Sequence, residues 1–178
     1  MQTLYQIVES PIGPLTILSD GEGLTGLYMN VHKYGPSQTD GWRLSPENPV
    51  VSETARQLRE FFLGTRLEFD LPLNASGTEF QRRCWQQLSR IPYGETWSYG
   101  EMAKKLGSPD ASRAVGAANG QNPISVIVPC HRVIGASGKL VGFGGGLPRK
   151  AALLAFERAI KFGESAQDFW SANSLASS

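Results

Sequence analysis

The sequence predicts an α+β fold in two parts: a small N-terminal β-sheet domain, residues 1–75, and a mostly helical C-terminal domain, residues 76–161. Three observations support this division. Short apolar stretches near the N-terminus flank turn residues, which is typical of strands. From residue 78 onward, apolar residues recur at helical spacing behind capping residues. The net charge also changes sign between the two parts.

In the N-terminal part, residues 4–8 and 15–18 are apolar on either side of the turn residues Ser-Pro-Ile-Gly-Pro, so we expect a hairpin that begins a small sheet. Residues 30–49 are rich in Gly, Pro and polar residues and predict a long, mobile loop. A helix is expected over residues 51–62 because apolar residues recur at helical spacing there. Residues 67–73 alternate apolar and other residues, as in a half-buried strand.

The C-terminal part opens with a capping box at Thr78, and Cys84 falls on the apolar face of the helix that follows. A second capping box at Ser98 begins a short helix, and Pro109 is expected in the first turn of the next one. Two short helices joined by a tight turn predict either a DNA-binding helix-turn-helix or an ordinary helical hairpin. A last helix begins at Pro148, and residues 162–178 are expected to form a flexible tail.

Composition places the chain among ordinary globular proteins, with 178 residues, 40% hydrophobic and 19% charged. It has neither an apolar run of about 18 residues nor a basic segment followed by an apolar one at the N-terminus, so we expect no membrane span and no secretion signal. We therefore expect a cytoplasmic protein, associated with the nucleoid if bacterial, with both cysteines reduced.

The net charge of +1 conceals a strong asymmetry along the chain. Residues 1–75 contain five Lys and Arg against nine Asp and Glu, whereas residues 76–161 contain twelve against five, a net charge of +7. A basic surface of this kind attracts polyanions such as DNA even when the whole protein is nearly neutral. A merely solvated basic face remains the alternative.

One of the two cysteines, Cys130, directly precedes His131 and Arg132 and follows a β-branched run and a proline. Sulfur attacks as the thiolate, so a nucleophilic cysteine needs a proton acceptor or a positive charge nearby; His131, Arg132 and Arg113 are candidates. The alternative is a buried cysteine that serves as a small hydrophobe. The adjacent His-Arg pair favours chemistry.

The segment Val-Pro-Cys-His-Arg-Val resembles the active-site signature of the O6-alkylguanine-DNA alkyltransferases. The resemblance covers about residues 80–157 and is weaker before them. Its further motifs are Ser98-Tyr99, Ser112-Arg113-Ala114-Val115-Gly116, Asn122-Pro123, Gly144-Gly145-Gly146 and Glu157. It implies a ribonuclease-H-like N-terminal domain and a winged-helix-like C-terminal domain.

The resemblance also implies direct DNA repair by a suicidal methyltransferase. Cys130 would take the alkyl group from O6-alkylguanine, and from O4-alkylthymine if the protein accepts it, after the nucleotide is flipped out of the duplex. His131 would deprotonate Cys130 through a water, with Glu157 orienting the imidazole. Tyr99 would donate to the departing base, and Asn122 would brace the turn.

Double-stranded DNA containing alkylated bases is the implied partner, bound through the minor groove by a monomer that can bind cooperatively. Arg113 would fill the gap left by the flipped base. The small residues Ala114, Ala118 and Gly120 would let the helix approach DNA closely. The substrate pocket would be lined by Val133, Phe143 and Gly144. Family members often carry tyrosine at the position of Phe143, so this chain lacks that hydroxyl.

Three other functions fit parts of the pattern. A cysteine hydrolase would use the same Cys-His-carboxylate chemistry but would not need the helix pair. A lesion sensor would bind DNA without an acceptor cysteine, and a transcription regulator would need more groups able to read base edges. His32 and His131 show no zinc-ligand spacing with the cysteines, and the Gly-rich stretch at 142–146 lacks the setting of a nucleotide site. We therefore expect no metal and no cofactor.

Overall fold

The N-terminal part is a four-stranded sheet in the order β3-β2-β1-β4, in a computed structural model that describes residues 2–29 and 39–176. The predicted hairpin is confirmed as β1 (Leu4–Val8) and β2 (Leu15–Ser19), which pair antiparallel. The sheet is extended by β3 (Leu24–Met29), antiparallel to β2, and by the short β4 (Arg43–Leu44), parallel to β1. The sequence did not predict these two strands. Of the loop predicted over 30–49, residues 30–38 lie outside the described residues.

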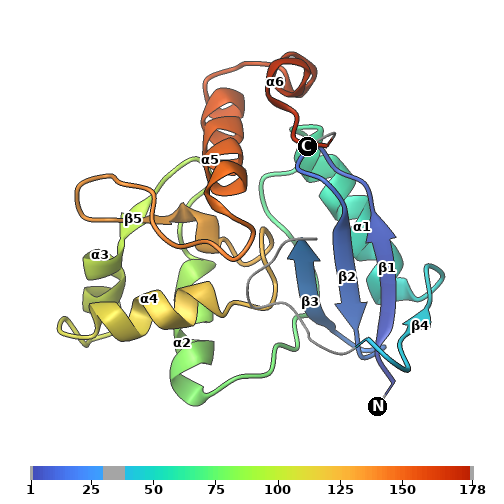
Figure 1. Ribbon diagram of the computed structural model, residues 1–178, viewed down its shortest axis with the longest axis horizontal. Coiled ribbons are helices and arrows are strands. Elements are labelled where there is room, and N and C mark those ends of the chain that lie inside the picture. Colours follow the sequence, from blue (N-terminus) through green and yellow to red (C-terminus); the bar gives the residue numbers. More distant parts are fainter. Residues whose placement is uncertain (1, 30–38, 177–178) are drawn as a thin grey trace.

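The predicted helix is confirmed as α1 (Pro49–Phe62), which runs along the sheet (Figure 1). Asn48 caps it by accepting from two backbone N–H groups of the first turn. The helix ends before Gly64, whose φ of 75° favours glycine. Its buried face includes Leu58 and Phe61, which join the hydrophobic core.

The strand predicted over residues 67–73 is wrong. This segment forms one isolated bridge, between Leu73 and Leu24 on β3, and Leu67 and Leu73 are about half exposed. At Asp70 the backbone partner is a side chain instead: the amide of Gln57 accepts from Asp70 N and donates to Asp70 O, both at 2.9 Å. The alternation of apolar and other residues therefore indicates a half-buried segment here, and not a paired strand.

The C-terminal part contains α2 (Glu79–Leu88), α3 (Tyr99–Lys105), α4 (Ser112–Gly120) and α5 (Leu147–Lys161). The capping box at Thr78 is present in full, and the Ser98 side chain caps α3. Helices α3 and α4 pack against each other as the predicted pair. Pro109, however, lies in the turn before α4, because Ala111 closes a turn on Ser108 and the helix begins only at Ser112.

The tail expected to be flexible instead forms a further helix, α6 (Ala166–Asn173). Trp170 packs at 4.7 Å from the Phe156 ring and donates from Nε1 to the Phe62 carbonyl. Phe169 is buried beside it. These aromatic contacts, each worth about 0.5–1.5 kcal/mol beyond burial, hold the segment against α5 and α1.

The free edge of β3 holds the chain that leads into Cys130. Leu27 donates to the Pro123 carbonyl at 2.8 Å and accepts from Ser125 at 3.2 Å. On α5, Arg149 donates to the Ile12 carbonyl in the β1–β2 turn. The sheet is thus a support for the Cys130 segment, and one hydrophobic core spans both parts. No helix in the described ranges is long and apolar enough to cross a membrane.

Candidate active site

Two tight turns shape the chain immediately before the cysteine. The first is a γ-turn closed by Ile127 N and Ser125 O, with Val126 at φ 71°, a strained conformation for a β-branched residue. The second is an inverse γ-turn at Pro129 (φ −81°, ψ 64°), closed by Cys130 N and Val128 O. Backbone strain of this kind persists only where surrounding contacts hold the chain in place, and it is common at active sites.

The 3-10 helix η1 (Cys130–Arg132) follows directly. The chain then pairs as β6 (Val133–Ile134) with β5 (Trp97–Ser98), which leads into α3. This parallel pairing brings Tyr99, the first residue of α3, to the same side of the domain as the cysteine. Two sequence segments more than thirty residues apart therefore meet at the site.

Asn122 braces the turn, as the resemblance implied. Its side chain, 2% exposed, donates to the Val128 carbonyl at 2.8 Å and accepts from Ile124 N at 3.0 Å. It therefore ties together both ends of the strained segment. It is also close enough to the sulfur to lower the pKa of Cys130.

His131, Arg132 and Glu157 form a buried network. His131 Nε2 lies 2.8 Å from Glu157 Oε2, and Arg132 makes two bonds of 2.8 Å to the two oxygens of the same carboxylate. Arg132 also donates to the Ile91 carbonyl. Burial alone would raise the pKa of Glu157, but His131 and Arg132 outweigh it and lower that pKa to about 2.

The ionised Glu157 fixes the tautomer of a neutral His131. Burial lowers the pKa of His131 against the opposing pull of Glu157, so the ring is neutral and its Nε2–H donates to the carboxylate. The other nitrogen, Nδ1, is then an unprotonated acceptor. It is buried and has no hydrogen-bond partner within the described part of the chain. This is the arrangement of a general base held by a carboxylate.

Cys130 is 4% exposed, and burial raises the pKa of its thiol; Asn122, Lys150 and Ser125 oppose that shift. The cation whose charge lowers the pKa of this thiol is thus Lys150. The sequence offered Arg132 and Arg113 for this role, but Arg132 is committed to Glu157 and Arg113 is exposed on α4. A thiol with a raised pKa needs a base before it can react.

Lys150 is completely buried on α5 and binds three backbone carbonyls, those of Val133, Val141 and Gly142, at 2.6, 2.9 and 3.2 Å. The Tyr99 hydroxyl donates to the same Val141 carbonyl at 3.0 Å. Burial lowers the pKa of Lys150 to about 8, against the opposing effect of Cys130. The lysine thus ties the chain after the cysteine to the Gly-rich loop.

A small cavity of about 320 Å³ opens between α4 and that loop. Phe143 and Gly144 from the loop line it, as do Gly116 and Gly120 from α4. Val133, also predicted for a pocket, is buried on β6 and does not line this cavity. The helix side of the cavity carries no large side chain, so a flat ring can approach the helix backbone closely.

Helix α4 presents Arg113, Ala114 and Ala117 outward, and Gly120 is half-buried. Ala118, predicted to contact DNA, is 2% exposed and faces the core, where its carbonyl accepts from Trp85 Nε1. On this turn of the helix the outward alanine is Ala117, which is exposed. The sequence placed small residues on this helix correctly but assigned one to the wrong face.

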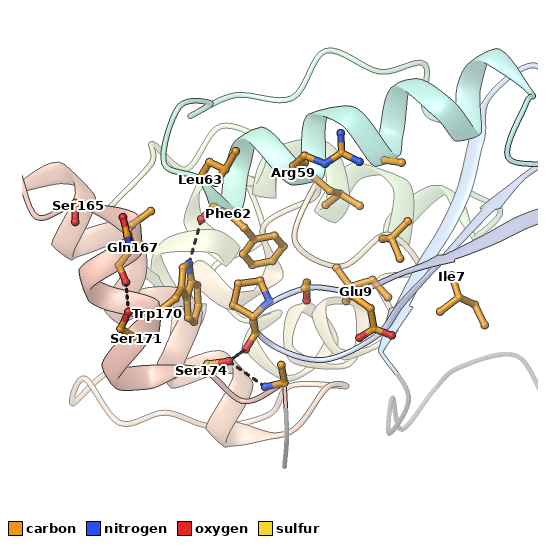
Figure 2. A pocket seen from close by; sticks show the side chains of 18 of the residues that line it. Ile7, Glu9, Arg59, Phe62, Leu63, Ser165, Gln167, Trp170, Ser171 and Ser174 are labelled. Atoms are coloured by element: carbon orange, nitrogen blue, oxygen red, sulfur yellow. Dashed lines mark hydrogen bonds between the residues drawn. The ribbon is translucent and has the colours of Figure 1, made fainter.

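A larger cavity, of about 1190 Å³, lies elsewhere, between β1, α1 and α6. Figure 2 shows Phe62 and Trp170 in its wall, joined by the bond from Trp170 to the Phe62 carbonyl. None of its lining residues belongs to the network around Cys130. The smaller cavity adjoins the site through Gly142, which lines it and whose carbonyl binds Lys150. Within residues 2–29 and 39–176, no three His, Cys, Asp or Glu side chains gather as metal ligands would; His32 lies outside these ranges.

Two family models match the chain. The ribonuclease-like domain of 6-O-methylguanine DNA methyltransferase matches residues 3–75, and the DNA-binding domain of the same family matches residues 79–159. The chain belongs to the 6-O-methylguanine DNA methyltransferase family. This settles the resemblance seen in the signature, and it agrees with the arrangement of a small sheet followed by a helical DNA-binding domain.

Relatives of this family are similar over most of the chain. Methylated-DNA–protein-cysteine methyltransferases from Mycobacterium tuberculosis and Methanosarcina acetivorans are 54% and 50% identical, over 87% and 86% of this chain and 92% and 97% of their own length. A crystal structure of M. tuberculosis OGT in complex with DNA aligns with a TM-score of 0.84 at 50% identity, covering 94% of this chain and 98% of that one. The family relationship therefore extends across both parts of the fold.

Proposed function

We propose that this protein repairs DNA directly, by moving the alkyl group of O6-alkylguanine irreversibly onto Cys130. The observation that carries the proposal is the buried Cys130 beside a neutral His131 whose Nδ1 is an unpartnered acceptor. Membership of the methyltransferase family and the similarity to a DNA-bound relative support the reaction and the partner.

The chemistry follows from these groups. The thiol proton passes through a water to His131 Nδ1, and the Glu157 carboxylate stabilises the imidazolium that forms. The sulfur attacks the alkyl carbon while the O6–carbon bond breaks, and the purine keeps the bonding electrons. Tyr99 leaves the Val141 carbonyl to donate to the departing base, and the backbone N–H of Gly144 helps to stabilise its charge. The thioether is not reversed, so each molecule acts once.

DNA binding by α4 through the minor groove, by a monomer, completes the proposal. An alkylated base inside a duplex must be flipped out to reach a buried thiol. The exposed Arg113 next to small outward residues fits a helix that presses closely on DNA and fills the resulting gap. The cavity beside α4, with Phe143 in its wall, fits the flipped ring.

Intact-protein mass spectrometry with peptide mapping tests this function. After mixing with a duplex containing O6-methylguanine, the protein should gain one methyl group per molecule, on Cys130. Cys130→Ala should gain none, whereas Cys84→Ala, which removes the other buried cysteine, should gain it as the wild type does. Binding of the duplex without any gain in mass would overturn the proposal in favour of a lesion sensor.

A further inference from the structure

Asn119 is a buried polar residue on the inner face of α4 that the mechanism above does not use. Its side chain is 3% exposed. Its Nδ2 donates to the Cys130 carbonyl at 3.3 Å, and the amide also lowers the pKa of the nearby Tyr99 hydroxyl. Its Oδ1 is buried without a hydrogen-bond partner among the described residues.

This residue type is costly at this position. Asparagine is a weaker helix former than leucine, and a buried acceptor left unpaired costs about 1–3 kcal/mol. The other buried positions of α4, Val115 and Ala118, are apolar, so packing alone does not require an amide. The contacts of Asn119 are with the backbone of the nucleophile and the side chain of the proposed acid, which points to the reaction and not to the core.

We propose that Asn119 is a positioning residue, which holds the Cys130 segment and the Tyr99 hydroxyl in register for alkyl transfer. The inference rests on the proposed function. As the O6–carbon bond breaks, the purine takes the bonding electrons and the Tyr99 proton, and negative charge grows on the phenolic oxygen. The Asn119 N–H stabilises that charge, in line with its lowering effect on a Tyr99 pKa that burial raises. Helix α4 thus presents Arg113 to DNA on one face and organises the reacting groups on the other.

Asn119→Leu tests this role because leucine has a similar volume and keeps the packing while it removes the N–H. Saturation kinetics with free O6-benzylguanine should show a maximal transfer rate about 10- to 100-fold lower than that of the wild type. Affinity for an unmodified duplex, which reports the outer face of α4, should change less than twofold. Asn173→Leu, on the distant helix α6, is the matched control and should match the wild type in both measurements.

A double-mutant cycle separates positioning from a general structural effect. On a Tyr99→Phe background, Asn119→Leu should lower the transfer rate less than threefold, because the hydroxyl that Asn119 stabilises is gone and only its bond to the Cys130 carbonyl is left to lose. The inference is overturned if Asn119→Leu keeps the wild-type rate, or if it slows both backgrounds equally while duplex affinity also falls. If the wild type itself takes no alkyl group onto Cys130, the proposed function has failed instead.

Discussion

Replacing Glu157 with glutamine tests the centre of the site. Glu157 is completely buried and accepts two bonds from Arg132 and one from His131, each of 2.8 Å. Glutamine leaves the buried guanidinium without a counter-charge, and removing one partner of a buried ion pair costs about 3–5 kcal/mol. For a protein of this size, that corresponds to a melting temperature lower by roughly 6–20 °C.

The same substitution should slow alkyl transfer for a separate reason. The glutamine amide can donate to His131 Nε2, which moves the ring proton to Nδ1 and removes the acceptor for the thiol proton. Loss of a general base lowers rates by about 10²–10⁴-fold, so single-turnover methyl transfer from an O6-methylguanine duplex at pH 7.5 should fall within that range.

Two further variants make the test decisive. Glu164→Gln, at an exposed position, is the matched control and should change the free energy of unfolding by less than about 0.5 kcal/mol. Adding Arg132→Met to Glu157→Gln removes the uncompensated charge, so stability should partly return while the rate stays low. The reasoning is refuted if the free energy of unfolding of Glu157→Gln lies within about 1 kcal/mol of the wild-type value, far less than the loss of about 3–5 kcal/mol expected, and if the variant transfers methyl at the wild-type rate.

Three other predictions concern residues around this network. Phe143→Tyr adds a hydroxyl at the cavity wall, and one new hydrogen bond of about 0.5–1.5 kcal/mol should raise methyl transfer up to about tenfold relative to benzyl transfer; identical rates would count against a role for this position. Arg113→Ala should slow repair of duplex DNA on the order of 10- to 100-fold, because flipping costs a few kcal/mol, while the reaction with free O6-benzylguanine stays unchanged; an equal loss with both substrates would contradict it. Because the folded-state pKa of Lys150 is about 8 and that of an unfolded lysine is about 10.4, the folded protein binds fewer protons between these values. The free energy of unfolding of the wild type should therefore rise with pH relative to Lys150→Met across this window, measured by urea denaturation; parallel pH dependences would exclude the shift.

Much of the local structure could be predicted from the sequence, because its signals are local. The capping box at Thr78 and the helical spacing after it determine α2, and the turn residues before Leu15 determine the hairpin. Because His131 and Arg132 directly follow Cys130 in the sequence, a reactive thiol could be inferred without knowledge of the fold. The match to a family signature then placed Tyr99, Asn122 and Glu157 in one site, and the structure does bring their segments together around the cysteine.

Only the tertiary structure decided which hydrogen-bond and charge partners the buried polar residues have. Arg132 lies two residues after Cys130, yet it binds Glu157, and the cation whose charge lowers the pKa of the thiol is Lys150 from α5. Residues 67–73 alternate like a strand, but apart from one bridge to Leu24 their backbone is held by the side chain of Gln57 at Asp70. Periodicity and capping report only interactions within a few residues, whereas the pairing of buried polar groups depends on which distant segments packing brings into contact. The sequence therefore indicated the hairpin, most of the helices and the candidate nucleophile, and the fold decided the electrostatic environment around that thiol.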